Sequence, residues 1–269
     1  MEELNLAALA AKVAGAVVIV IAAARLAERA GPFVGAMIAT LPVSTGPIYV
    51  FLAMDHGAAF IAQAAVSSVA GTAAIVAFIA AHALAAQRFA TAGALALATL
   101  AWLCATLLLR LHAWSFAEAC VLLAGSFALA VRGLRRFAVA VPPVAGPRAR
   151  FDLPFRALLV AVLVIATTLA GRAFGPSLTG LLATYPVVFT SLIVILQPRG
   201  GGAFVSAVLV NGLKGLLGFG TALAVLHLAA LRIGAVGALV LALAVAVGWN
   251  ATLALLRRSR TARRTVPLQ

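Results

Sequence analysis

Apolar residues fill long continuous runs along this chain, and short polar segments separate the runs. A helix needs about 20 such residues to cross the hydrocarbon core of a bilayer. The pattern therefore predicts an all-α polytopic membrane protein with about nine transmembrane helices. The bounds that we expect are roughly 5–25, 32–54, 58–81, 90–109, 114–131, 154–171, 176–196, 203–227 and 233–256.

Composition agrees with this pattern and excludes a soluble globular protein. The chain is 65% hydrophobic and 10% charged, and its mean hydropathy is +1.16. Such values are typical of chains that are buried in lipid over most of their length. The first apolar run has acidic residues before it and arginines after it, and no convincing small-residue cleavage site, so we interpret it as a retained span.

One segment of the chain occurs twice. The residues Gly31–Val43 (GPFVGAMIATLPV) return as Gly175–Val187 (GPSLTGLLATYPV), and the same register places Gly71 on Gly215. If spans one to four correspond to spans six to nine, the fifth span is a connector and an odd number of crossings separates equivalent helices. The pattern predicts a 4 + 1 + 4 inverted repeat, an arrangement typical of alternating-access transporters. The alternative is a duplication that only makes a larger bundle.

The duplication also predicts how the chain is divided. We expect a first four-helix repeat, then a connector helix followed by a cytoplasmic linker rich in arginine and proline, then a second, inverted four-helix repeat and a basic cytoplasmic tail. These segments comprise residues 1–110, 111–153, 154–257 and 258–269.

The net charge of +14 would suggest a nucleic-acid partner in a soluble chain, but here the positions of the arginines indicate topology. In a nine-span arrangement, 15 arginines fall on one side, which the positive-inside rule assigns to the cytoplasm. They are Arg25, Arg29, Arg88, Arg132, Arg135, Arg136, Arg148, Arg150, Arg156, Arg199, Arg257, Arg258, Arg260, Arg263 and Arg264. We therefore predict a multi-pass protein of the inner cell membrane, with its N-terminus outside and its C-terminus in the cytoplasm.

Proline falls at equivalent positions inside two spans. Pro42 and Pro186 each lie about ten residues into a predicted helix, where proline removes a backbone donor and frees carbonyl groups. The pattern predicts broken helices whose ends bind polar groups; the alternative is a pair of kinks mended by hydroxyl groups. The nearby candidates for substrate binding are Thr40 and Ser44 in the first copy, and Thr184 and Tyr185 in the second.

Lys214 is the candidate charge of the site. Counting from the ends of its span at 1.5 Å per residue puts it about 20 Å from either side, where a charge is costly and usually faces a cavity or the bundle interior. Asn211 lies three residues before it on the same helix face. Glu118 is the nearest candidate partner. Without that pair, Lys214 binds an anionic substrate, takes up a proton in a cycle, or bonds to carbonyls of a broken helix.

The remaining polar residues indicate no catalysis. Lys12 lies near the outer end of the first span, and we interpret it as a topological charge that reaches the surface. The histidines fall near span ends without metal-ligand spacing, and Cys104 and Cys120 lie in apolar runs without a metal-binding pattern. We expect no enzyme, no metal and no cofactor.

The motif from Gly35 to Ser44 (GAMIATLPVS) resembles the second helix of the small four-span bacterial membrane proteins of the GlpM-like kind. Each half of this chain is similar to one such protein, so the chain looks like a fused, duplicated form. The resemblance implies membership of a family of uncharacterised inner-membrane proteins, one branch of which is linked to exopolysaccharide production. It supplies no catalytic residues.

These observations favour a secondary transporter that moves a small anionic solute through a mid-membrane site. Two alternatives stay open: an accessory or interaction subunit of a complex that processes envelope polysaccharide or lipid, and a lipid-headgroup flippase. The partners that we expect are the lipid bilayer and a small anion, with a second copy of the chain or an envelope protein as further partner classes.

Overall fold

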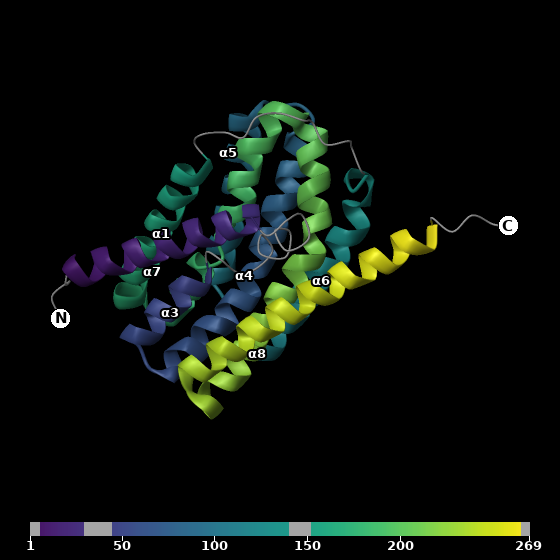
Figure 1. Ribbon diagram of the computed structural model, residues 1–269. Helices are drawn as coiled ribbons and strands as arrows, with labels where there is room; N and C mark the ends of the chain where they lie inside the picture. Colours follow the sequence, from purple (N-terminus) through teal and green to yellow (C-terminus); the bar gives the residue numbers. More distant parts are fainter. Residues whose placement is uncertain (1–5, 30–44, 140–151, 265–269) are drawn as a thin grey trace.

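The computed structural model describes residues 6–29, 45–139 and 152–264, and all of its regular elements there are helices. Figure 1 shows them as a bundle, with the start of α1 and the end of α8 on opposite sides of the view. The elements are α1 (Leu6–Arg29), α3 (Thr45–Asp55), α4 (Ala58–Ala85), α5 (Thr91–Arg110), α6 (Phe116–Gly133), the 3-10 helix η1 (Arg135–Phe137), α7 (Asp152–Leu182) and α8 (Val187–Arg264).

Five of these helices, α4 to α8, are long and apolar enough to cross a membrane. The described residues therefore confirm the prediction of a helical membrane protein. They contain seven α-helices, so the predicted count of nine is not reproduced as separate elements. The difference lies mainly in α7 and α8, each of which covers more than one predicted span.

Three glycines interrupt α7 and α8. Gly175, Gly201 and Gly234 have φ values of 74°, 76° and 75° with extended ψ values, a conformation that only glycine adopts without strain. α7 therefore consists of the segments 152–174 and 176–182, and α8 of 187–200, 202–233 and 235–264.

Close contacts across two of these glycines show that the chain folds back on itself. A methyl group on Gly212 would lie 3.2 Å from the ring of Phe189, and one on Gly218 would lie 2.2 Å from the ring of Trp249. Gly201 and Gly234 are thus the turns of two antiparallel helix hairpins.

α4 lies at the centre of the bundle (Figure 1) and contacts α5, α6, α7 and α8. It is rich in small residues, and Ala64, Ala65, Ala70 and Ala74 are fully buried, which lets neighbouring backbones approach closely. The outer helices α5 and α6 expose large apolar side chains instead, among them Leu100, Leu107, Leu108 and Leu129. An apolar surface of this kind is expected to face lipid.

The segment 202–233 of α8 runs antiparallel to α4. At one end of the pair, His227 Nδ1 lies 2.9 Å from the carbonyl oxygen of Ala62, and at the other end Gln87 Nε2 donates to Ser206 Oγ at 3.3 Å. A methyl group on Gly202 would lie only 1.8 Å from the carbonyl oxygen of Ala86. The two helices are therefore in close contact over most of their length.

Candidate functional site

Helical structure is interrupted between Leu182 and Val187, inside the bundle. Thr184 N and Tyr185 N bond back to the carbonyl oxygens three residues earlier, and Pro186 has no N–H to continue the ladder. A new helix begins where Thr190 N donates to Pro186 O at 2.9 Å. The helix break that the sequence predicts at Pro186 is therefore present.

Four hydroxyl groups hold this break against α3 and α4, and we call them the hydroxyl cluster: Thr45, Tyr49, Ser68 and Thr184. Thr45 Oγ1 donates to the carbonyl oxygen of Ala183 at 3.1 Å. Thr184 Oγ1 donates to the carbonyl oxygen of Leu181 at 2.6 Å. The four residues are between 0% and 6% exposed, so the cluster is a polar site within an apolar bundle.

Ser68 links the two sides of the break. Its hydroxyl donates to the carbonyl oxygen of Gly180 at 2.6 Å and lies 2.7 Å from Tyr49 OH. Because Ser68 has a single hydrogen to give, Tyr49 must be the donor in the second bond. Thr184 N bonds to Leu181 O instead of to Gly180 O, so Ser68 supplies the bond that the end of the helix would otherwise lack.

Replacing Ser68 by alanine should leave Gly180 O and Tyr49 OH without partners. A buried polar group without a partner costs about 1–3 kcal/mol, so we expect a clear loss of thermal stability in detergent micelles. Ser126→Ala is the matched control, because within the described ranges Ser126 Oγ bonds only to Leu123 O of its own helix, and we expect a change within about 0.5 kcal/mol. Equal effects of the two substitutions would contradict this account of the cluster.

The structure brings three of the predicted site residues together. Thr184 belongs to the hydroxyl cluster, and Tyr185 and Pro186 follow it in the break. The Tyr185 ring meets Trp102 edge-on, with centroids 5.0 Å apart, and its hydroxyl accepts a bond from Thr190 Oγ1 at 3.3 Å. The predicted residues of the first copy, Thr40, Pro42 and Ser44, lie outside the described residues.

Asn211 and Lys214 lie elsewhere on the bundle. Asn211 Nδ2 donates to the carbonyl oxygens of Ala138 and Ala207, at 3.1 and 2.8 Å. The side chain of Lys214 is exposed, and its carbonyl oxygen accepts a bond from Trp249 Nε1 at 2.9 Å. The hydroxyl cluster as described therefore does not include the charge that the sequence assigned to it.

The place of Lys214 can be given relative to a basic turn, while its depth in a membrane stays a prediction. Ala138 follows η1, whose Arg135 and Arg136 are exposed, and Asn211 is level with it. Lys214 is three residues further along the helix, a rise of about 4.5 Å, so its ammonium can extend toward the level of this basic turn.

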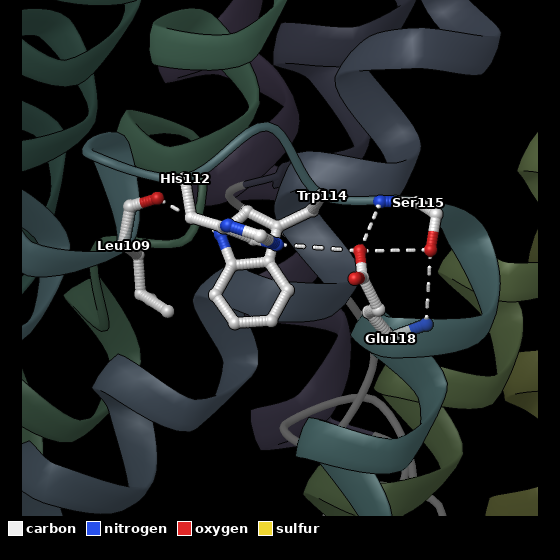
Figure 2. Close-up of polar contacts among 5 residues, drawn as sticks. All are labelled: Leu109, His112, Trp114, Ser115 and Glu118. Carbon is white, nitrogen blue, oxygen red and sulfur yellow. Dashed lines mark hydrogen bonds and ion pairs between the residues drawn. The ribbon is translucent and has the colours of Figure 1, made fainter.

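Glu118, the candidate partner of Lys214, forms its ion pair and hydrogen bonds with other residues in the described part of the chain. Figure 2 shows that its carboxylate closes a capping box at the start of α6. Oε2 accepts bonds from Ser115 N at 2.9 Å and Ser115 Oγ at 2.8 Å, and His112 Nε2 lies 3.3 Å away. A Ser-x-x-Glu spacing before an apolar run is the signal that could have placed this residue.

Two buried polar pairs were missed by the sequence analysis. Lys12 is 8% exposed and forms an ion pair with Asp55, so its interpretation as a surface-seeking charge is wrong. His82 is fully buried, its Nε2 lies 2.9 Å from Gln197 Oε1, and its Nδ1 has no hydrogen-bond partner among the described residues. Both pairs join residues far apart in the sequence, which hydropathy alone does not connect.

No protein-family model matches the chain, and no curated protein or solved structure matches it either.

Proposed function

We propose that this protein is a secondary transporter that moves a small anionic solute across the inner membrane by alternating access, with the hydroxyl cluster as its central site. The observation that carries the proposal is the interruption of the helix at residues 183–186, held by hydroxyls of α3 and α4. Broken helices of this kind place helix ends and polar groups beside the substrates of many transporters. Here the hydroxyls that bond to the carbonyl oxygens of the break are the polar groups that a solute would meet.

The helix boundaries support the inverted repeat. Residues 31 and 175 begin the two copies in the sequence and are 144 positions apart. At the same spacing, Gly57 caps the start of α4 and Gly201 turns the chain before 202–233, while Ala90 caps the start of α5 and Gly234 turns the chain before 235–264. We therefore keep the 4 + 1 + 4 arrangement, nine crossings and the GlpM-like kinship as parts of the proposal.

The antiparallel pairing of α4 with 202–233 supports a two-fold axis in the membrane plane. Equivalent residues of the two helices are 144 positions apart in the sequence. In the antiparallel pairing, such a pair lies side by side near Thr72 and Leu216, and the two-fold axis would pass there. The helix break is next to this point, because a methyl group on Gly71 would lie 2.8 Å from Thr184 Oγ1. Transporters with inverted repeats bind their substrates at this position.

Charge supports an anionic solute. The start of the segment 187–200 faces the break, and the first N–H groups of a helix carry the positive end of its dipole. The chain has 20 basic and six acidic side chains. A carrier of metal cations would be expected to bind its ion with carboxylates. The four residues of the hydroxyl cluster offer hydroxyl groups instead.

A lipid-headgroup flippase is the second candidate, and one cavity favours it. A cavity of about 380 Å³ lies between α1, α3 and the last two segments of α8, and its lining is almost entirely apolar. Ile19, Val50 and Val240 at its edge are exposed, so it opens toward the lipid. Thr45 and Tyr49 belong both to its wall and to the hydroxyl cluster, which would place an acyl chain beside the polar site.

A thermal-shift screen of the purified protein tests the proposal. Anionic metabolites and lipid headgroups are compared, and a ligand at 100 times its Kd should stabilise the folded state by about 2.7 kcal/mol. Thr184→Val should weaken the shift. Thr221→Val is the matched control and should keep it, because Thr221 Oγ1 bonds only within its own helix. Lys214→Ala shows whether that residue contributes.

The ligands that stabilise the protein in the screen are then tested for transport in proteoliposomes. Uptake of a stabilising anion that Thr184→Val slows and Thr221→Val does not would support the carrier. Stabilisation by lipids alone, with lipid exchange between leaflets, would favour the flippase. Binding of neither class would contradict both proposals and direct attention to an accessory role in an envelope complex.

A further inference from the structure

Three polar side chains, from α1 and from the end of α3, lie where α3 ends and α4 begins, and a fourth lies near them on α7. Both carboxylate oxygens of Asp55, the last residue of α3, lie against Lys12 Nζ of α1. His56 follows in the turn. Arg172 of α7 is close enough to act electrostatically on His56. We call this group the ion-pair cluster: Lys12, Asp55, His56 and Arg172.

His56 is held in place by packing. Its ring stacks on Phe60, with centroids 3.9 Å apart and planes within 8°, and a methyl group on Gly171 would lie 3.2 Å from its Nε2. Burial lowers the pKa of His56 below its ordinary value, while Asp55 opposes this shift and Lys12 and Arg172 add to it. The imidazole is therefore neutral at pH 7, so it does not compete with Lys12 as the cation that pairs with Asp55.

The two partners of the ion pair differ in their access to solvent. The side chain of Lys12 is 10% exposed, and that of Asp55 is 23% exposed. Water and protons therefore reach the carboxylate first. Asp55 is the partner of Lys12 in the described structure, so protonation of Asp55 would leave a buried ammonium without a counter-charge, which is unfavourable. Another anion can then take its place.

The surrounding charge makes this exchange directional. With His56 neutral, the cluster holds two cations, Lys12 and Arg172, and one carboxylate. Protonation of Asp55 would leave the cluster with a net charge of +2, which attracts an anion from the aqueous side. The ion pair also ties α1 to the end of α3, and these helices contact one another. Loss of the pair would release this end of the bundle.

We propose that Asp55 is the proton-coupling group of the carrier, and that Lys12 binds the anionic group of the solute when Asp55 is protonated. One proton from the aqueous phase adds to the Asp55 carboxylate, and a carboxylate, sulfate or phosphate group of the solute replaces it on the Lys12 ammonium. Release of the solute returns the proton and restores the ion pair. This inference rests on the proposed transport function, and it adds the coupling ion and a second anion-binding position.

Isothermal titration of the purified full-length protein with sulfate and with succinate tests the proposal. Titrations in buffers of different ionisation enthalpy count the protons that enter with each anion. We expect about one proton per anion, and an affinity that falls about tenfold per pH unit as the pH rises. Lys12→Met should abolish binding at this position.

Matched variants identify the group that takes up the proton. Asp55→Asn should bind the anion without proton uptake and with little dependence on pH, because the competing carboxylate is gone. His56→Gln should keep the full proton count, and Arg232→Met, which removes an exposed cation, should keep both binding and proton uptake. If Asp55→Asn does not fold, Asp55→Glu should keep the uptake of about one proton per anion, because it keeps a carboxylate beside Lys12.

The results separate this inference from the function on which it rests. Anion binding without proton uptake, or a proton count that Asp55→Asn leaves unchanged, would overturn the coupling role. Uptake of an anion into proteoliposomes that ignores the pH gradient would overturn it as well, while leaving the transporter proposal intact. Proton-linked binding without any flux would keep the site and contradict transport. If neither sulfate nor succinate binds the wild type at any pH, the proposed site is overturned.

Discussion

Replacing Gly180 by alanine should destabilise the protein strongly, by about 3 kcal/mol, the upper part of the range for overpacked sites. A Cβ atom at this position would lie 2.1 Å from the carbonyl oxygen of Ala64 and 2.9 Å from its carbonyl carbon. Both atoms belong to the backbone of α4, the central helix, so no side-chain rotation can relieve the overlap. The helix would have to move away from α4, and Ser68 would lose its bond to Gly180 O.

Gly125→Ala is the matched control for this substitution. Gly125 lies in the middle of α6, and no atom is within 4 Å of the position of its Cβ. Alanine is preferred over glycine in a helix interior by roughly 0.5–1 kcal/mol, so this variant should be as stable as the wild type or more so. Thermal unfolding of both variants in the same detergent gives the comparison. A Gly180→Ala protein that unfolds at the wild-type temperature would show that the break does not pack against α4 in this way.

The parts of the fold that depend on local chemistry could be predicted from the sequence. Long apolar runs predict helices, and α4, α5 and α6 begin within two residues of their predicted starts at 58, 90 and 114. Proline without an N–H predicts an interruption, and Pro186 lies in one. The hydroxyls of Thr184 and Tyr185 could likewise be assigned to the break, because they are its neighbours in the chain.

The parts of the fold that depend on how the helices pack could not be predicted from the sequence. The pairing of Lys12 with Asp55 joins residues 43 positions apart, and no periodicity connects them. The bond of Ser68 to Gly180 O requires α4 to lie against α7, which no local pattern predicts. The bond of Asn211 to Ala138 joins residues 73 positions apart, and the sequence gives no signal for it.

Replacing Lys12 by methionine should cost about 3 kcal/mol, the lower end of the range for breaking a buried ion pair, because the Asp55 side chain keeps 23% of its surface exposed. Methionine fills a similar volume, so most of the loss comes from the carboxylate that is left without a counter-charge. The double variant Lys12→Met with Asp55→Leu should recover most of the stability, since an apolar pair often replaces a buried ion pair without loss.

The cycle formed by these variants measures the coupling between the two side chains directly. Arg232→Met serves as the control for removing a cation, because Arg232 is exposed, and its effect should stay within about 0.5 kcal/mol. Asp55→Leu alone completes the cycle. If the stability loss of the double variant equals the sum of the losses of the two single variants, the coupling is zero and the ion pair contributes nothing beyond its separate side chains. If the double variant is stable yet binds no anion, the pair is dispensable for folding, and its retention in an apolar bundle is explained by the chemistry of the bound anion and its proton.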